Sequence, residues 1–337
     1  MSSPLHGKAT PRLTLAVLSY RQSAYIEDAV RSALEQIGEP IEVLLSDDCS
    51  PDDTYARMQA LVEAYRGPHQ VMLRRNERNL GIGAHVDEVM KLARGELLVL
   101  MGGDDISLPD RASATLEAYD ATGQGADLLA CDVVDMSADG IDLGVIEVDD
   151  LSQWRSVDDW IRRRPYVIGA GHAVTRRLVE RFGPLQPGVV EEDQVNALRA
   201  LCSNGAVTIR RALVRYRRGG ISAGSSELTV QDFLNQTRRR NYGHLALLRQ
   251  WRADASIAGC AEAVARATQL AYDRETFISE LLSSTSFTGR LQAVRRATHV
   301  APGWRLKKLL YFQWPEIAVG VRRLQQRWRQ IAFKARR

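Results

Sequence analysis

The sequence contains no uninterrupted apolar run that is long enough to form a membrane-spanning helix. The runs LTLAVL (13–18) and LLVLM (97–101) are too short, and the apolar segment 309–321 contains Pro315 and Glu316. The N-terminal sequence MSSPLHGKAT also lacks the apolar stretch of a signal peptide. These absences predict a soluble chain in the cytoplasm.

Cysteine and histidine are scarce as well. The four cysteines, Cys49, Cys131, Cys202 and Cys260, show none of the paired spacings that are typical of zinc or redox sites, so reduced thiols are expected. The six histidines are scattered along the chain, which argues against a metal centre built from histidine. Hydrophobic residues make up 45% and charged residues 26% of the 337 positions, which is typical of a globular protein.

Acidic residues are nearly absent from the last part of the chain. Between Thr288 and Arg337 there are 13 Lys/Arg and one Asp/Glu, a net charge of +12. Because the whole chain has a formal net charge of +4, the rest of the sequence carries −8. The excess of positive charge therefore lies in the tail, and it bears on which partner or surface the tail binds.

The sequence up to about residue 135 alternates between compact apolar runs and helical patterns. The apolar runs lack the two-residue alternation of half-exposed strands, so strands buried on both faces are predicted. Strand and helix in turn imply right-handed crossovers and a mostly parallel sheet of the α/β class. The predicted strands cover 13–18, 41–45, 71–75, 96–101 and 127–131.

The pattern loosens between Met136 and Pro165, where Trp154 and Trp160 occur. Beyond this segment the predictions are a helix at 192–202, strands at 206–210 and 212–217, a linker at 219–226 and helices from there to the end.

Polar residues follow three of the predicted strands. The first strand ends in Ser19-Tyr20-Arg21, the second in Ser46-Asp47-Asp48, and the strand at 96–101 in Gly102-Gly103-Asp104-Asp105. Open parallel sheets bind ligands at the carboxyl ends of their strands, so these residues are expected to converge on one crevice. Clustered carboxylates would suit a divalent cation that holds a diphosphate, and the glycines would admit a close backbone approach.

Several ordered motifs resemble those of the family 2 glycosyltransferases, which are inverting enzymes of the GT-A fold. The motifs are LTLAVLSYRQSAYIEDAVRSALEQ, EVLLSDDCSPDDT and RNLGIGAHVDEVMKLARGELLVLMGGDDISLPDR, and the resemblance extends from about Leu13 to Ser222. It implies a Rossmann-like GT-A domain at 11–225, with a mostly parallel sheet flanked by helices. Residues 226–337 would form a helical, basic C-terminal extension.

The resemblance also implies which residues bind a nucleotide sugar. Tyr20 would stack on the base, Asp47 would hydrogen-bond a pyrimidine N–H, and Asp104 would ligate Mg²⁺ or Mn²⁺ in an Asp-x-Asp-like signature. Arg217 and Arg218 would neutralise the diphosphate. The full set implied for the donor and its metal is Leu18, Ser19, Tyr20, Arg21, Asp47, Asn79, Gly81, Gly103, Asp104, Arg217 and Arg218.

Asp193, in Glu191-Glu192-Asp193, matches the catalytic base of the family. In the implied mechanism its carboxylate takes the proton of an acceptor hydroxyl, whose oxygen attacks the anomeric carbon from the face opposite the leaving nucleoside diphosphate. One displacement inverts the configuration. The implied donor is a UDP- or dTDP-sugar, and the acceptor is a saccharide, which could be lipid-linked, in bacterial surface-polysaccharide assembly.

The chain departs from the family pattern at three places. Many members have histidine in the loop that matches RYRRGGIS (215–222), where this chain has Arg217 and Arg218. Gly102 stands where the first aspartate of the metal signature is expected, so Asp104 is the direct metal carboxylate and Asp105 a helper. Cys49 replaces the usual glycine of Asp-Asp-Gly-Ser, which predicts a change in packing.

Less specific interpretations of the acidic residues stay open. Asp104 and Asp105 could cap the helix that follows Pro109. Asp48 is expected to hold its turn rather than to contact a ligand, and Glu192 is an alternative base.

Other singled-out residues have structural alternatives too. Trp154 and Trp160 could line an acceptor pocket or pack in the core, and His172 is expected to be structural. The segment NLGIGAHVD lacks the third glycine of a dinucleotide-binding fingerprint and is interpreted as a chance match.

The tail has the pattern of a basic amphipathic helix. Such a helix with tryptophans is typical of binding to a membrane surface, and packing against its own domain or a second subunit is equally open. Region 303–337 is therefore predicted to contact a membrane or a homo-oligomer partner, and the protein could be peripheral at the inner face of the membrane. No nucleic-acid binding is predicted, because no recognised module surrounds the charge. The apolar positions are Ile317, Val321, Leu324, Trp328 and Ile331, and the arginines off this face are Arg322, Arg323, Arg327 and Arg329.

Two other functions stay open beside glycosyl transfer. The chain could be an inactive nucleotide-sugar-binding or scaffold protein that acts through its basic tail, which Gly102 makes conceivable. It could also be a nucleotidyltransferase of similar fold, although that leaves Glu192-Asp193 and RYRRGGIS (215–222) unexplained.

Overall fold

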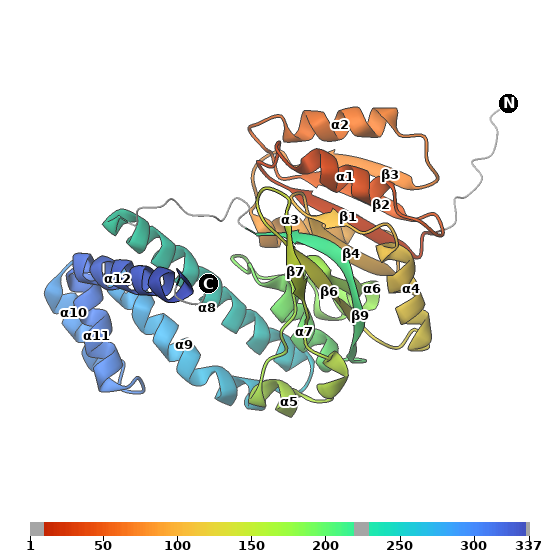
Figure 1. Ribbon diagram of the computed structural model, residues 1–337. Coiled ribbons are helices and arrows are strands. Elements are labelled where there is room, and N and C mark those ends of the chain that lie inside the picture. Colours follow the sequence, from red (N-terminus) through yellow and green to blue (C-terminus); the bar gives the residue numbers. More distant parts are fainter. Residues whose placement is uncertain (1–9, 219–228, 335–337) are drawn as a thin grey trace. The chain divides into compact units, whose positions relative to one another are not determined.

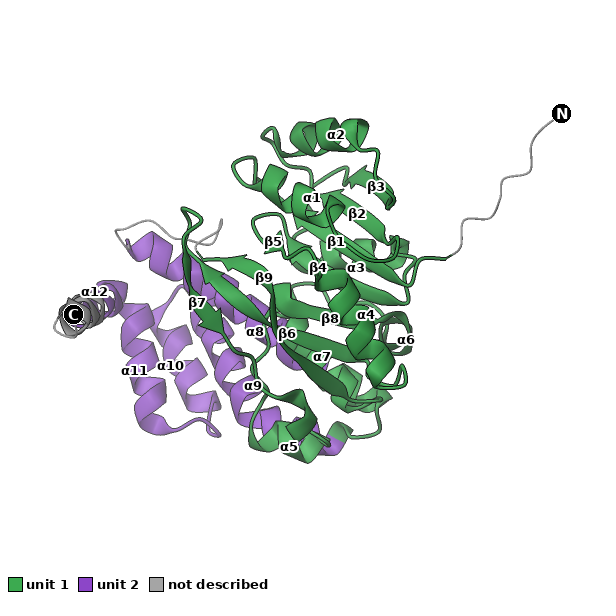
Figure 2. Cartoon of the chain, turned by 45° about the vertical axis from the view of Figure 1, so that its right-hand side comes forward, with its two compact units in different colours: residues 1–223, 253–261 green, residues 224–252, 262–337 purple. Residues whose placement is uncertain are grey.

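The computed structural model describes residues 10–218 and 229–334, and the chain forms two compact units (Figure 1). The first unit takes the chain up to residue 223, and the second takes 224–252 and 262–337 (Figure 2). Residues 253–261 return to the first unit. The sequence suggests one division near residue 225, whereas a short segment beyond it belongs to the first unit.

The first unit is built around one β-sheet (Figure 1). Its strands are β1 (Leu13–Ser19), β2 (Glu42–Asp47), β3 (Gln70–Arg75), β4 (Leu97–Gly102), β5 (Ile106–Ser107), β6 (Leu128–Met136), β7 (Asp142–Ile146), β8 (His172–Thr175) and β9 (Ala206–Arg217). Within the described residues the strand order is β3-β2-β1-β4-β8-β6-β9-β5, and β7 pairs with Val133–Met136 of β6, beyond the residues of β6 that pair with β8.

The sheet is parallel in its first half and mixed in its second. Strands β3, β2, β1 and β4 are parallel neighbours, as their apolar runs predict. Strand β8 then runs antiparallel to both β4 and β6, while β9 is parallel to β6. The α/β class is confirmed, but the sheet is mixed rather than mostly parallel. The reason is that β8 follows the irregular segment after β6 and not a crossover helix.

The two strands expected at 206–210 and 212–217 form the single strand β9. Its register against β6 shifts on either side of Asp132, so a local irregularity replaces the expected break in the strand.

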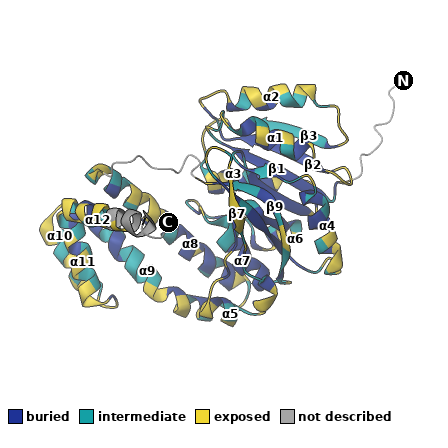
Figure 3. Ribbon diagram, in the orientation of Figure 1, coloured by how far each residue is buried: buried dark blue, intermediate teal, exposed yellow. Residues whose placement is uncertain are grey.

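Helices cover the sheet of the first unit. They are α1 (Ile26–Leu34), α2 (Thr54–Ala64), α3 (Ile82–Leu92), α4 (Arg111–Ala121), α5 (Val157–Arg162), α6 (Arg176–Phe182) and α7 (Glu192–Leu201), with the short 3-10 helices η1 (Leu151–Gln153) and η2 (Gly169–Gly171). Helix α1 places Ile26, Ala29, Val30 and Ala33 on one face, because these residues recur every three to four positions, and this face packs on β1, β2 and β4. Figure 3 shows the resulting buried sheet between exposed helix faces.

The second unit is helical. Its helices are α8 (Val230–Ile257), α9 (Ala261–Ser283), α10 (Phe287–Arg296), α11 (Pro302–Gln313) and α12 (Pro315–Lys334), and the last turn of α8 already belongs to the first unit. Phe277, Leu281, Leu309 and Phe312 form its core, with Trp304 packed against them. Among the helices of residues 10–218 and 229–334, none carries an apolar stretch long enough to span a bilayer.

Candidate active site

The three strand ends that carry polar residues lie at one level of the sheet. Leu18 on β1 is in register with Ser46 on β2 and with Gly102 on β4, and Ser19 is in register with Asp47. The segments that follow these strands are joined as well, because the N–H of Gly103 donates to the carbonyl of Leu18 at 2.8 Å. The predicted convergence at this edge of the sheet is therefore present.

Asp47 lies behind this edge. Its side chain is fully buried, and its carboxylate accepts hydrogen bonds from the backbone N–H and the hydroxyl of Ser50. It also forms an ion pair with Arg75, with 3.3 Å between Oδ2 and Nε. Asp47 thus fixes the turn after β2, and its predicted contact with a base stays a prediction.

Asp48 faces the crevice although it is nearly buried. Its carboxylate accepts hydrogen bonds from the side-chain amide of Asn76 at 2.7 Å and from the N–H groups of Leu80 at 2.8 Å and Gly81 at 2.9 Å. The Asn79 amide donates to its carbonyl at 3.3 Å. Asp48 therefore holds the loop before α3, as expected of a turn residue, and contributes to the cavity wall as well.

A cavity of about 960 Å³ opens at this edge of the sheet. Its volume lies within the range of small-molecule and cofactor sites. The predicted residues on its wall are Leu18, Ser19, Tyr20, Asn79, Gly81, Asp104, Asp193 and Arg217. The predicted residues Arg21, Asp47, Gly103 and Arg218 lie off the wall.

The two glycines before Asp104 serve the packing of their neighbours. A Cβ on Gly102 would lie 2.8 Å from Oδ1 of Asp104 and 3.0 Å from Oδ2 of Asp105, so both carboxylates fold back over this residue. A Cβ on Gly103 would meet Oε1 of Gln22 at 2.5 Å and the side chain of Ile26. Glycine is required at both positions because neighbouring side chains already fill the space that a Cβ would occupy.

Asp104 and Asp105 follow β4, and this pair, the β4 carboxylates, is electrostatically strained. Burial raises the pKa of Asp104, and the charge of Arg217 and a hydrogen bond from Gln22 oppose this shift. Burial and the neighbouring Asp104 raise the pKa of Asp105 to about 7. Adjacent buried carboxylates of this kind favour a bound cation. In the described residues, no group of three or more His, Cys, Asp or Glu side chains is arranged to hold a metal ion, so the carboxylate ligands at this point are limited to the pair.

Arg217 lies on the cavity wall with its guanidinium already engaged. The group lies 4.4 Å from the centre of the Tyr25 ring, its Nε donates to the carbonyl of Asp104 at 2.9 Å, and Nη1 donates to the carbonyl of Ala138 at 2.8 Å. Its backbone N–H donates to Asp105 at 2.9 Å. Arg217 therefore supports the loop of both aspartates and brings a positive charge next to them.

Arg218 points elsewhere. Its Nε pairs with the carboxylate of Asp135, and its side chain is 61% exposed. The rest of the predicted loop, 219–222, lies outside the described residues.

The start of α7 supplies another part of the wall, with Glu191, Glu192 and Asp193. Burial, together with repulsion from Asp193, raises the pKa of Glu192 to about 7. Burial raises the pKa of Asp193 to about 6, although the N–H of Gln194 donates to its Oδ1 at 2.8 Å. Each carboxylate can hold and release a proton near neutral pH, which is what a general base requires.

Tyr216 is a wall residue that the sequence interpretation missed. Burial raises its pKa, and the charges of Asp105 and Asp104, then Tyr166 and Asp193, raise it further. Its ring therefore lies within electrostatic reach of the β4 carboxylates and of the candidate base. The only sequence signal was its place in RYRR, beside the arginines that drew attention.

His85 is a second wall residue that was missed. Its Nε2 lies 2.7 Å from the hydroxyl of Ser46, and burial lowers its pKa to about 4, so the imidazole is neutral near pH 7. It lies within NLGIGAHVD, a segment that the sequence interpretation set aside as a chance match.

Trp154, Trp160 and His172 belong to the interior. The two tryptophans are 6% and 1% exposed and lie off the cavity wall, which supports core packing over an acceptor pocket. The indole N–H of Trp154 donates to the carbonyl of Arg163 at 2.6 Å. The imidazole of His172 is buried against the carbonyl of Gly169, as expected of a structural residue.

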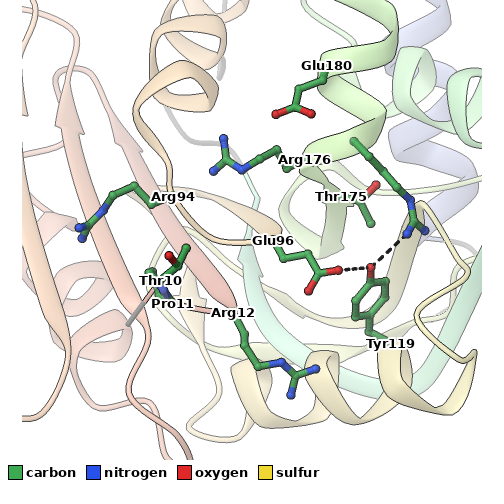
Figure 4. A pocket seen from close by; sticks show the side chains of 10 residues that line it. Thr10, Pro11, Arg12, Arg94, Glu96, Tyr119, Thr175, Arg176 and Glu180 are labelled. Atoms are coloured by element: carbon green, nitrogen blue, oxygen red, sulfur yellow. Dashed lines mark hydrogen bonds between the residues drawn. The ribbon is translucent and has the colours of Figure 1, made fainter. Parts of the chain in front are cut away.

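A second cavity, of about 430 Å³, lies at the opposite, amino-terminal edge of the strands (Figure 4). Its wall carries four arginines, and Tyr119 donates to Glu96 at 2.6 Å across it. Each guanidinium is held by the protein itself, so this cavity is a poorer candidate than the one at the carboxyl edge. Arg12 pairs with Asp120, Arg94 with Glu42 and Arg177 with Asp127, and Arg176 donates to the carbonyls of Ala93 and Gly95.

Comparison with known proteins finds similar sequences for the first part of the chain. Residues 14–159 match the sequence profile of the family described as "Glycosyl transferase family 2". The Succinoglycan biosynthesis protein ExoO of Rhizobium meliloti (strain 1021) is 35% identical over 143 residues, which are 42% of this chain and 39% of that protein. The Putative teichuronic acid biosynthesis glycosyltransferase TuaG of Bacillus subtilis (strain 168) is 30% identical over 107 residues, 32% of this chain and 41% of that protein.

Solved structures share the fold. S. aureus TarS in complex with UDP-GlcNAc superposes with a TM-score of 0.53 at 17% identity, over 95% of this chain and 92% of that chain. The mannosyltransferase PcManGT of Pyrobaculum calidifontis, in complex with GDP-Man and Mn²⁺, gives a TM-score of 0.52 at 18% identity, over 93% of this chain and 87% of that chain. At these identities the likeness shows the fold alone.

Together these observations confirm the resemblance drawn from the sequence. Residues 14–159 match the model of glycosyl transferase family 2, and the chain has the GT-A fold with a helical C-terminal region. The matches span about two fifths of the length of ExoO and TuaG.

Proposed function

We propose that the first unit is an inverting glycosyltransferase, which moves a sugar from a UDP- or dTDP-sugar to a hydroxyl group of a saccharide. The observation that carries this proposal is the sharing of one cavity by the β4 carboxylates and the carboxylate of Asp193. A transferase of this kind needs the leaving diphosphate and the attacking hydroxyl on the two sides of one anomeric carbon. Tyr216 lies on the wall of the same cavity, and the charges of Asp104, Asp105 and Asp193 all raise its pKa.

The nucleoside would bind at the ends of β1 and β2. Tyr20 is half-buried on the wall and can stack on a base, and Asn79 and Gly81 border the same region. We assign recognition of the pyrimidine N–H to Asp48 rather than to Asp47, because Asp48 reaches the cavity wall. Its carboxylate oxygens have lone pairs left after the hydrogen bonds from the loop before α3.

The carboxylates on β4 fit a divalent cation of the Mg²⁺ or Mn²⁺ type. Asp104 would be the direct ligand and Asp105 would support it, because Asp105 is nearly buried and accepts a hydrogen bond from Arg217. Ions of this class take one or two carboxylates together with substrate phosphates. When bound, the ion would stabilise the negative charge that develops on the leaving diphosphate.

Arg217 lies on the cavity wall, and its positive charge would stabilise the negative charge of the same diphosphate. We propose a smaller role for Arg218, which would have to leave Asp135 to reach it. On the acceptor side, Asp193 would accept the proton of the attacking hydroxyl, a contribution of about 10²- to 10⁴-fold in rate.

The acceptor is proposed to be a saccharide of a bacterial surface polysaccharide. The printed names of ExoO and TuaG support this assignment, since they refer to succinoglycan and teichuronic acid biosynthesis. A lipid-linked saccharide would place the reaction at the cytoplasmic face of the membrane.

The test is donor turnover by the full chain. UDP- and dTDP-sugars are incubated with the protein and Mn²⁺, and the anomeric configuration of the released or transferred sugar is followed by NMR. We expect slow turnover with inversion, its loss with EDTA, and a fall of about 10²-fold or more in Asp193→Asn with donor binding retained. Retention of configuration, or an Asp193→Asn variant as active as the parent, would overturn the proposal.

A donor-binding protein without turnover is the second candidate. Gly102 favours it, because it removes one carboxylate from the expected metal signature. This candidate predicts calorimetric binding of a UDP- or dTDP-sugar that Asp104→Ala abolishes, with no product from any donor and acceptor tried.

A further inference from the structure

Helix α12 packs with small side chains inward and large apolar side chains outward. Ala318 and Val319 are buried against Phe233 of α8. Ile317, Leu324 and Trp328 are 49%, 57% and 70% exposed. Spacings of seven and four residues place these three on one face of the helix, so they form a single stripe. The packing of the second unit does not use this stripe.

Other exposed apolar side chains lie nearby in sequence. Trp314, at the junction of α11 and α12, is 48% exposed. Leu306 and Leu310 are exposed one turn apart on α11. Tryptophan is enriched where proteins meet the boundary between lipid and water, because its ring is apolar and its N–H is polar.

The unit that carries the stripe is strongly basic. Residues 224–252 and 262–337 contain 20 Lys/Arg and 7 Asp/Glu, a net charge of +13. Because the total is +4, the first unit carries −9. Charge of one sign is therefore concentrated in the helical unit, where it would attract an anionic surface over about a Debye length.

Four of these cations are grouped without a compensating ion pair. Lys307 and Lys308 lie on α11, Arg322 on α12 and Arg240 on α8. Their charges act on one another. Burial lowers the pKa of Lys308, Glu275 opposes the shift, and Lys307, Arg322 and Arg240 lower it further. Within residues 10–218 and 229–334, no carboxylate lies within ion-pair distance of these four side chains.

Aromatic rings hold three of the four cations in place. Lys307 lies 5.6 Å from the ring centre of Tyr311, Lys308 lies 5.1 Å from that of Trp304, and Arg322 lies 4.7 Å from that of Phe233. These ring contacts offset part of the repulsion among the cations, and anionic groups of a binding partner would reduce it further.

We propose that α11 and α12 dock the second unit onto an anionic lipid bilayer. Trp314, Ile317, Leu324 and Trp328 would enter the boundary between headgroups and acyl chains, and the basic residues would lie near the phosphates. The biological purpose rests on the proposed function, since docking would bring the active site to a lipid-linked acceptor. A second copy of the chain is the less favoured occupant, because two units of +13 repel each other across an isologous contact.

The experiment is co-sedimentation of the full chain with vesicles. Vesicles of equal parts phosphatidylglycerol and phosphatidylcholine are compared with phosphatidylcholine alone, at about 50 mM and about 500 mM salt. We expect binding to the anionic vesicles that is about tenfold or more stronger at low salt. The double variant Leu324→Ser/Trp328→Ser should lose about tenfold or more in vesicle affinity, and Lys307→Gln/Lys308→Gln about tenfold.

The matched control is Ile141→Ser/Leu143→Ser, just before and within β7, where both side chains are also exposed, at 63% and 55%. This variant should bind vesicles like the parent protein. Equal binding by the parent and Leu324→Ser/Trp328→Ser, or no binding to anionic vesicles, would overturn the proposal. A dimer in light scattering that Leu324→Ser/Trp328→Ser dissociates would assign the stripe to a second copy instead. Release from vesicles by inorganic phosphate, beyond the effect of its ionic strength, would assign the cations to a free anion.

Donor turnover with a soluble acceptor, measured without vesicles, separates this inference from the proposed function. Leu324→Ser/Trp328→Ser should turn over donor at the parent rate. If vesicle binding fails while turnover persists, only the docking is wrong. If vesicle binding persists without turnover by any variant, only the enzymatic assignment is wrong.

Discussion

Cys49 occupies a backbone conformation that side chains rarely adopt. Its φ is 60°, in the left-handed region. The glycine that the family usually has at this place is therefore explained by backbone conformation, whereas the sequence suggested a change in packing. Its thiol makes one weak contact, 3.6 Å from the carbonyl of Glu77, which offsets little of the strain.

We predict that Cys49→Gly stabilises the protein by about 1 kcal/mol, because glycine adopts a positive φ without steric cost. Urea denaturation followed by circular dichroism measures the change. The control is Ala60→Gly on the exposed side of α2, which should lose about 1 kcal/mol. A lower stability for Cys49→Gly would show that the turn tolerates the side chain without strain.

The fall in activity at low pH should reflect the protonation of Asp193. A base must be deprotonated to accept a proton, and burial raises its pKa to about 6, so kcat/KM should fall about tenfold per pH unit below pH 6. Glu191→Gln should move this fall in activity to lower pH, because the charge of Glu191 raises the pKa of Asp193.

Glu192→Gln distinguishes the two candidate bases in the same assay. If Asp193 is the base, this variant keeps activity within about tenfold of the parent. If activity is lost in Glu192→Gln and kept in Asp193→Asn, Glu192 is the base.

At the scale of single residues, the sequence did not reveal which member of an adjacent pair lies on the cavity wall. Asp47 and Asp48 follow a strand buried on both faces, so no alternation of polar and apolar residues marks the side that each one takes. The engagement of Arg217 with backbone carbonyls was equally invisible, because its partners at Asp104 and Ala138 are distant in sequence.

Secondary-structure elements were more readable. The strands that end at Ser19, Asp47 and Gly102 were each foreseen, and so was the start of α7 at Glu192. Their hydrophobic runs and helix signals are local and strong. The rule on carboxyl ends then placed the acids that follow β2 and β4 at one edge of the sheet, whereas Asp193 was assigned from the resemblance to the family. The direction of β8 was not readable, since it depends on pairing between residues that are far apart in the chain.

Helix α7, which begins with the candidate base, is anchored at its other end by a buried ion pair. Arg199 pairs with Asp254 through two contacts of 2.8 and 3.2 Å, and both side chains are 1% exposed. Their loss of hydration is compensated only while both partners are present.

We predict that Asp254→Ala destabilises the protein by about 3–5 kcal/mol, because it leaves the Arg199 charge buried without its partner. Thermal and urea unfolding measure the effect. The double variant Arg199→Met/Asp254→Leu should recover most of the loss, since apolar side chains of similar volume carry no such penalty. Equal losses in the single and the double variant would argue that packing volume, and not charge, is decisive at this place.

At the scale of the whole molecule, the sequence suggested two consecutive parts divided near residue 225. The linker composition at 219–226 is a real signal, but the helical pattern continues without interruption through α8. Nothing in that pattern marks the return of 253–261 to the first unit. This return is a tertiary property, and the buried ion pair of Asp254 with Arg199 is one of its contacts.

A chain that ends at Ser225 should therefore fold poorly, because it lacks Asp254. We expect it to be less stable than the full chain by about 3 kcal/mol or more, or to be insoluble. Arg199→Met in the shortened chain should restore part of the stability, which soluble yield and unfolding curves would measure. A shortened chain that is as stable as the full chain would show that the returning segment is dispensable.

The return of nine residues to the first unit also restricts how this protein can be rearranged, by nature or by design. If everything after the linker were replaced by another sequence, Arg199 would lose Asp254 as its ion-pair partner. An exchange of the helical unit alone would therefore have to keep the segment from Ala253 to Ala261. The two units are interleaved in the gene, so they are expected to be inherited and exchanged as one block.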